Sequence, residues 1–330
     1  NAAGTASLQL SGFRTYGIIV SHGSDSSTIG GSTTNARNII SGNGSFGIML
    51  GQGGFSGNNN VVQGNYIGLD TSGTQAIGNA YTGIIVQGNS VGTTIGGTVA
   101  GQGNVIAGTT FGGIASGYPD GLQAGIVVTG TTTTNPTGTL IQGNKIGTDA
   151  AGTPGVAFGN GRAGILIMSN AQSTTVGGSV AGAGNLISSS TTGVEVMSRL
   201  SGGITTTPLG NLILGNSIYG NSGLAIDLTQ DTVDDTPITA ATNVGVTAND
   251  SGDGDTGPSA LQNFPVMTSA TIMGSQVVVA GLLNSTASTT YRIEFFANST
   301  ADGTGYGEGQ RYLGFVNVAT DGSGKPTLAD

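Results

Sequence analysis

The stretch NDSGDGDTG, at positions 249–257, places several oxygen-bearing side chains close together. They are Asn249, Asp250, Asp253 and Asp255. Carboxylate and amide oxygens are hard ligands of the kind that Ca²⁺ prefers, and the intervening glycines allow the backbone to fold around an ion. The spacing is not that of an EF-hand, because the glutamate at the twelfth position is missing. We therefore expect a structural Ca²⁺ site here; the alternative interpretation is a hydrated acidic linker.

Two further acids occupy equivalent places in a repeated phrase. Asp70 lies in IGLDTSGT and Asp149 lies in IGTDAAGT. An aspartate that caps a tight turn through its own backbone explains both copies better than a duplicated catalytic residue does. We expect both side chains to be turn residues.

No arrangement of residues predicts catalysis. His22, the only histidine, lies in the polar phrase SHGSDSS, whose Ser24 and Asp25 are its neighbours along one turn. Neighbours along a turn rarely have the geometry of a catalytic triad. Glu195 and Arg199 are most simply a surface ion pair. The acids of residues 1–228 are widely spaced, so no carboxylate pair of a glycosidase is visible in the sequence, although stacking could bring distant ones together. We expect no enzyme.

The elements that would position these residues are short repeated strands. The phrases NIISGN, NVVQGN and NVIAGT begin at Asn38, Asn60 and Asn104. STIGG at 27–31 returns as TTIGG and TTVGG further along the chain. Runs such as GIIV and GIML are rich in β-branched residues and bounded by Gly or Asn, which is typical of strands. A period near 22 residues predicts an all-β solenoid, a parallel β-helix of about ten coils, whose recurring aliphatic pairs share one interior.

The charge distribution and the residue composition exclude several classes of function. Residues 1–228 hold six acids and five bases, whereas residues 229–330 hold eleven acids and three bases. A nearly neutral body with an acidic end is a poor partner for nucleic acid, because phosphate contacts need clustered Lys and Arg. The chain has no Cys, so disulfides and thiolate metal sites are excluded. No apolar run approaches the length of a membrane helix, so we expect no membrane span.

Several phrases together resemble a known family. NYIGLDTSGT and NKIGTDAAGT, with NIISGN, GIIV and TIGG, resemble secreted bacterial right-handed parallel β-helix repeat proteins of the pectin-lyase-like superfamily. GLAIDL, then NDSGDGDTGPSALQNFPV and TTYRIEFFAN, resembles the segment that closes the helix in such proteins and leads into an immunoglobulin-like module. The resemblance implies a parallel β-helix at 1–228 and part of an immunoglobulin-like β-sandwich at 264–330. Between them, at 229–263, we expect an acidic junction, which contains the candidate Ca²⁺ ligands named above.

The expected role is structural. We expect an extracellular or cell-surface protein, a stalk, adhesin or fibre subunit, whose signal peptide is not in this chain. Its partners would be other copies of itself, neighbouring surface proteins or glycans. The last module has too few strands for a full sandwich. We expect that the given chain ends before the remaining strands; the alternative is that a donor strand from another subunit completes the sheet. The alternative function is a polysaccharide-acting enzyme, a lyase or glycoside hydrolase, or a glycan-binding module on the same β-helix.

Overall fold

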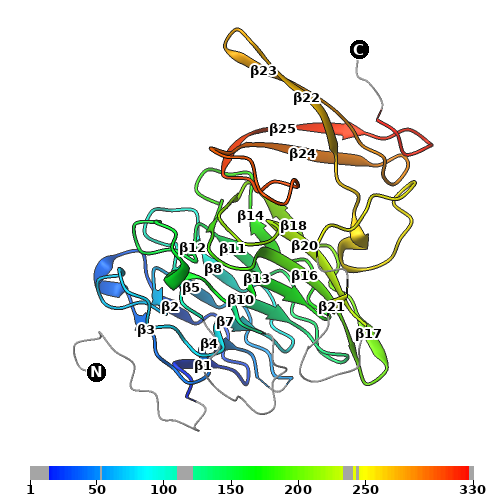
Figure 1. Cartoon of the computed structure of the whole chain (residues 1–330). Helices are drawn as coiled ribbons and strands as arrows, with labels where there is room; N and C mark the ends of the chain where they lie inside the picture. The colour runs from blue at the N-terminus through cyan, green and yellow to red at the C-terminus, as the bar shows by residue number, and fades with distance from the viewer. Residues whose placement is uncertain (1–14, 53, 110–121, 233–240, 243–244, 327–330) are drawn as a thin grey trace.

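Three parallel β-sheets contain most of the regular structure between Ile18 and Asp231 (Figure 1). The computed structural model describes residues 15–52, 54–109, 122–232, 241–242 and 245–326. The chain visits the first, second and third sheet in turn, so every third strand, leaving out β17, returns to the same sheet beside its predecessor. We call one such visit to all three sheets a circuit, and the parallel strands from β1 to β20 together the three-sheet stack.

The strands of the stack are short, and each sheet is built in chain order. The first sheet contains β1 (Ile18–Val20), β4 (Phe46–Leu50), β7 (Thr82–Val86), β10 (Ala124–Thr129), β13 (Ala163–Met168), β16 (Thr192–Ser201) and β20 (Ile226–Asp231). The second contains β2 (Thr28–Gly30), β5 (Val61–Gln63), β8 (Thr94–Gly96), β11 (Leu140–Gln142), β14 (Thr175–Gly177) and β18 (Leu212–Leu214). The third contains β3 (Ile39–Ile40), β6 (Tyr66–Ile67), β9 (Val105–Ile106), β12 (Lys145–Ile146), β15 (Leu186–Ile187) and β19 (Ser217–Ile218).

Few other elements accompany the stack. Two antiparallel strands extend the first sheet: β17 (Ile204–Thr206) pairs with β16, and β21 (Ala241–Thr242) pairs with β20. The helical segments of the described residues are short 3-10 turns, none of which could cross a membrane. They are η1 (Thr34–Ala36), η2 (Val156–Phe158) and η3 (Pro258–Leu261).

The interior is a continuous column of aliphatic side chains. Successive strands of the first sheet place Ile48, Ile84, Ile126 and Ile165 in register, and all four are fully buried. Isoleucines and valines of the other two sheets complete the same cluster. Because one circuit alone exposes its aliphatic side chains on two faces, only stacking removes them from water.

Glycine has a packing role in the first sheet. Gly125, in the phrase AGIVV of β10, shows why a glycine precedes the aliphatic run. A Cβ added there would lie 2.8 Å from the carbonyl oxygen of Gly164 and 2.9 Å from Cγ2 of Ile146. The glycine that precedes the aliphatic run is therefore required by the close approach of two circuits.

A column of asparagines, all buried except the first, joins the circuits before each strand of the third sheet. The side chain Nδ2 of each donates to Oδ1 of the next, at 2.9–3.0 Å. The backbone N–H of each donates to the same oxygen, at 2.9–3.2 Å. This asparagine column consists of Asn38, Asn65, Asn104, Asn144, Asn185 and Asn216. It satisfies amide groups that the turns would otherwise bury without partners.

The observed repeat corrects the predicted period. Successive members of the asparagine column are 27 to 41 residues apart, not about 22. The error arose because the same phrase is used at two corners: Asn60 precedes a strand of the second sheet, whereas Asn38 and Asn104 precede strands of the third. In the described residues the first sheet has seven parallel strands, fewer than the ten coils expected.

The aliphatic pairs also differ from the expectation. The first residue of each pair points outward and the second inward, so Ile39 is 38% exposed while Ile40 joins the core. The two residues of a pair cannot both point inward, because successive side chains of a strand lie on opposite faces of the sheet.

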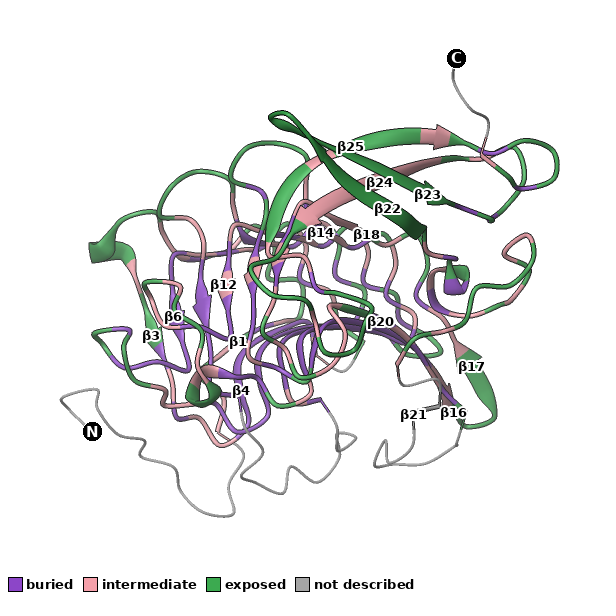
Figure 2. Ribbon diagram, turned by 45° about the horizontal axis from the view of Figure 1, so that its top comes forward, coloured by how far each residue is buried: buried purple, intermediate pink, exposed green. Residues whose placement is uncertain are grey.

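Residues after 264 form two antiparallel hairpins. One pairs β22 (Val266–Met273) with β23 (Gln276–Leu282), and the other pairs β24 (Thr290–Ala297) with β25 (Arg311–Ala319). They are separate two-stranded sheets, and every residue of β22 and β23 is exposed (Figure 2). The immunoglobulin-like assignment stays a prediction, since the described strands do not enclose a sandwich core.

The segment before β25 docks on the last circuit of the stack. The carbonyl oxygen of Gly309 accepts from the backbone N–H of Ile218 at 2.8 Å, and that of Gln310 accepts from Ser217 Oγ at 2.5 Å. Glu294 of β24 accepts from the N–H of Gly215 at 2.8 Å. The second hairpin is therefore anchored to the end of the stack by hydrogen bonds.

Candidate functional site

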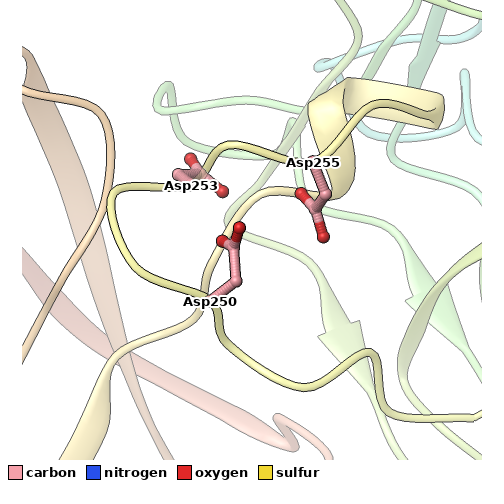
Figure 3. A group of neighbouring side chains, drawn as sticks. All are labelled: Asp250, Asp253 and Asp255. Atoms are coloured by element: carbon pink, nitrogen blue, oxygen red, sulfur yellow. The ribbon is translucent and has the colours of Figure 1, made fainter.

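Three aspartates of the predicted cation site converge in one loop. Asp250, Asp253 and Asp255 come from the loop before η3, and their side chains surround a common space in Figure 3. One carboxylate oxygen from each lies within 4.8 Å of the others. The tight turn depends on backbone at positive φ, 76° at Gly252 and 58° at Asp253. The spacing D-x-x-D-x-D thus brings the three acids together.

Hydrogen bonds fix the loop against the base of the first hairpin. The Asp253 carboxylate accepts from the N–H of Asn263 at 2.9 Å and from Ser285 Oγ at 2.6 Å. The Asp250 carboxylate accepts from the N–H of Gly254. Because Asn263 precedes β22 and Ser285 follows β23, the position of the loop and the root of this hairpin are linked.

Asn249, the fourth predicted ligand, is used differently. Its Oδ1 accepts from the N–H of Phe264 at 3.0 Å, and its Nδ2 donates to the carbonyl oxygen of Phe264 at 2.8 Å. The side chain is therefore committed to the backbone at the start of the hairpin. It positions the loop from outside the group of three carboxylates.

The cluster holds uncompensated negative charge. Burial, together with the charges of Asp250 and Asp253, raises the pKa of Asp255. Among the described residues, none of the three forms an ion pair with Lys or Arg. Three converging carboxylates offer the oxygen ligands that a divalent cation such as Ca²⁺ prefers.

A second charged group, buried on the outward face of the first sheet, was missed by sequence reasoning. The outward column of this sheet is apolar through Met49, Ile85, Val127 and Leu166. It ends in two acids on neighbouring strands, Glu195 of β16 and Asp227 of β20, which are direct register partners. Each is only 4% exposed.

Arg162 neutralises one of these acids. Its Nε and Nη2 donate to the two carboxylate oxygens of Glu195, both at 2.6 Å. Thr229 Oγ1 donates to the same carboxylate at 2.8 Å. The expected surface pair of Glu195 with Arg199 is therefore wrong. Glu195 points outward to a guanidinium 33 residues away, from the previous circuit, and no local pattern indicates that partner.

Asp227 has weaker support. Its Oδ2 accepts from the N–H of Gly245 at 3.1 Å, while its Oδ1 is buried without a hydrogen-bond partner among the described residues. Burial raises the pKa of Asp227 to about 6, and the adjacent Glu195 charge acts in the same direction. The two neighbouring acids thus differ: Glu195 is ion-paired, and Asp227 readily takes up a proton.

The remaining predicted residues behave as expected. Asp70 accepts from the N–H groups of Thr74 and Gln75 at 2.9 and 3.0 Å, and Asp149 accepts from the N–H of Thr153 at 2.7 Å. Both are turn residues, as predicted.

His22 is exposed and forms no triad. Its Nδ1 lies 2.7 Å from Ser21 Oγ, and its ring stacks on Phe55 with the centroids 4.0 Å apart. The nearby acid, Asp25, accepts instead from the N–H of Asn58. Within the described residues, no hydrogen bond joins the histidine to this carboxylate.

Comparison with known proteins leaves the family open. No protein-family model matches the sequence, and no curated protein matches it. The all-β class and the parallel sheets are given by the structure itself, and membership of a particular superfamily is a matter for proposal.

Proposed function

We propose that this chain is an extracellular structural or adhesive protein, a stalk or fibre subunit. In this proposal the three-sheet stack is a right-handed parallel β-helix of the pectin-lyase-like type, secreted by a bacterium. Support comes from the ordered circuits, the parallel register and the continuous aliphatic interior. Stacked repeats of this kind lengthen a protein along one axis. Right-handedness follows the general preference of parallel crossover connections.

Stiffness is the mechanical property that the stack supplies. Adjacent circuits are joined by backbone hydrogen bonds in three sheets and by the asparagine column. Bending the stack would strain these bonds on one side and compress packed isoleucines on the other. A rod of this kind suits a protein that holds a terminal module away from a surface.

The exposed first hairpin is the observation that carries an assembly role. Strand pairing places Met267, Ala270, Ile272, Val277 and Val279 on one face, together with Gly281. Of these, Ile272 is 79% exposed and Val277 is 58% exposed. An isolated two-stranded hairpin is marginally stable in water, and large exposed apolar patches mark interaction sites. We call this the apolar face.

A second copy of the chain is the occupant that we propose for the apolar face. No charged residue occurs between Asp255 and Arg292, although the whole chain carries a net charge of −9. A charged partner would gain no complementary contact on this hairpin, whereas two copies of it meet without repulsion. Both hairpin edges carry backbone groups that can pair with another strand, and no Lys or Pro within β22 or β23 blocks such pairing. Antiparallel pairing of two identical edges gives a self-complementary, two-fold contact.

Ca²⁺ would stiffen the root of this hairpin. A cation held by Asp250, Asp253 and Asp255 would fix the loop that Asp253 connects to Ser285. The proposed role of the ion is to orient the hairpin, not to catalyse.

Sedimentation velocity over a range of protein concentrations tests the assembly. The full chain is expected to form dimers or longer filaments, and the double variant Ile272→Lys/Val277→Lys is expected to remain monomeric. Val156→Lys is the matched control, because Val156 is a 96% exposed valine outside the hairpins. A wild-type chain that stays monomeric in the presence of Ca²⁺, or a double variant that assembles like the control, contradicts the proposal.

The alternative is a polysaccharide-acting enzyme or a glycan-binding module, and one observation favours it. Glu195 and Asp227 are register partners on adjacent strands. The backbones of neighbouring strands in a sheet are about 4.8 Å apart. Glycosidases use two carboxylates about 5–10 Å apart, one of which is protonated at working pH. Release of reducing ends from a panel of polysaccharides, abolished in Glu195→Gln and in Asp227→Asn, would establish this function in place of the structural one.

A further inference from the structure

A cavity of about 470 Å³ opens on the outward face of the third sheet. Its floor follows one outward column, in which Tyr66, Val105 and Lys145 stand on three successive strands. Its lining also includes Ala150, from the turn that Asp149 caps, and Thr98 and Ala100, from the loop after β8. The cavity is distant in sequence from the acidic junction and from the Glu195 group.

Two positive charges line this cavity. Arg37 and Lys145 are two of only eight basic residues in a chain of net charge −9. No acidic residue lines the cavity, and neither base forms an ion pair within the described residues. Val105 stands on the strand between those of Tyr66 and Lys145. The backbones of Tyr66 and Lys145 are therefore two strand spacings, about 10 Å, apart.

The side chains of the two bases are held in place by contacts that leave donors free. The guanidinium of Arg37 lies over the Tyr66 ring, 3.9 Å from its centroid, and its Nε donates to the carbonyl oxygen of Gly64 at 3.2 Å. Lys145 Nζ donates to the carbonyl oxygen of Ala150 at 2.6 Å. Within the described residues the structure shows no partner for the Nη groups of Arg37 or for the other ammonium protons of Lys145.

We propose that this cavity binds an oxyanion-bearing ligand, whose carboxylate, sulfate or phosphate group lies between Arg37 and Lys145. An anion there would accept charge-assisted hydrogen bonds from both side chains, and the fork of the guanidinium suits a planar or tetrahedral oxyanion. Tyr66 and Val105 offer an apolar floor for the body of the ligand. The site is independent of the proposed assembly role, since no residue of the hairpins lines it.

Titration followed by NMR tests the site directly. The side-chain Nε–H signals of the arginines of the full chain are recorded during addition of sodium sulfate, sodium phosphate or sodium glucuronate, with sodium chloride at matched ionic strength as the reference. We expect a saturable shift of the Arg37 signal with at least one oxyanion and none with chloride. Saturation by sulfate or phosphate assigns the site to the bare oxyanion, whereas saturation by glucuronate alone assigns it to a carboxylate carried on a sugar.

Substitutions separate a site from general charge attraction. Arg37→Gln and Lys145→Gln should each weaken binding at least about tenfold, because each removes a hydrogen bond to a charged group. Binding by Arg37→Gln is followed through backbone amide signals of the third sheet. Lys145→Arg should retain binding, and Lys325→Gln, which removes one positive charge far along the chain, should leave it unchanged.

Thermal unfolding of each variant checks that it folds. The proposal is overturned if no oxyanion shifts the Arg37 signal beyond the chloride reference. It is equally overturned if folded Arg37→Gln and Lys145→Gln bind as tightly as Lys325→Gln.

Discussion

Glu308 caps Asn221 at the end of the three-sheet stack. The Oε1 atom of Glu308 lies 3.1 Å from the backbone N and 2.8 Å from the Nδ2 of Asn221, and both groups donate to it. Asn43 makes the same two donations to Asn79 Oδ1, at 3.1 and 2.8 Å, from one circuit to the next. The carboxylate thus occupies the place that an asparagine of a following circuit would have. The terminal segment ends the stack without leaving these donors unpaired.

Removing this cap should destabilise the protein. Glu308→Ala leaves two donors of the half-buried Asn221 without this charged acceptor and should lower the free energy of unfolding by about 1–3 kcal/mol. Glu308→Gln should lose less, because one amide oxygen can accept both donations, as in Asn79. Urea unfolding curves measure both. Equal losses for the two variants would show that the oxygen acceptor is not what stabilises this end.

Replacing an asparagine in the middle of the asparagine column should destabilise the protein. Asn144 accepts from the N–H and Nδ2 of Asn104 and donates to Asn185, so Asn144→Ala leaves several buried groups unpaired. We expect a loss of at least about 3 kcal/mol in the free energy of unfolding, from roughly 1–3 kcal/mol per unsatisfied group. Asn89→Ala is the control, because Asn89 is exposed. Urea unfolding that ranks the two variants equally would contradict a structural role for the column.

Asp227 should make stability depend on pH in a defined window. Its folded-state pKa of about 6 lies above the ordinary value of 3.8. Between pH 3.8 and about pH 6, the Asp227 carboxyl ionises in the unfolded chain but stays protonated in the folded one. The free energy of unfolding therefore falls as the pH rises through this window, and it does not recover at higher pH. Asp227→Asn removes this cost. The variant should unfold at a higher temperature than the wild type at about pH 7.5 and show no gain at about pH 3.5. A gain of the same size at both pH values would mean that ionisation is not the cause.

Calcium should raise the unfolding temperature of the full chain. A ligand that binds only the folded state at a hundred times its Kd adds about 2.7 kcal/mol. Asp253→Asn should reduce the response, because it removes one of the three converging charges. Asp302→Asn, an exposed turn aspartate elsewhere in the last module, should respond like the wild type. Thermal scans with Ca²⁺ and with a chelator give the comparison. A wild-type chain that is unaffected by both would assign the acidic loop to a hydrated linker.

Local patterns predicted much of the fold and part of the acidic site. β-Branched runs bounded by Gly and Asn marked the strands, and the turn role of Asp70 and Asp149 followed from their own phrases. The convergence of Asp250, Asp253 and Asp255 also followed from their spacing, because all three belong to one tight loop. Asn249 shares that loop, yet its side chain is used by Phe264, which lies 15 residues further on.

Residue type and short-range alternation were enough to predict the all-β class, the glycine-rich turns and the division into a nearly neutral body and an acidic end. Three-dimensional folding sets the length of each circuit, pairs Arg162 with Glu195 and Asn221 with Glu308, and brings Arg37 and Lys145 to one cavity. These features escape prediction because stacking joins residues tens of positions apart. Turns of variable length change that separation from one circuit to the next, so no fixed period in the sequence records it.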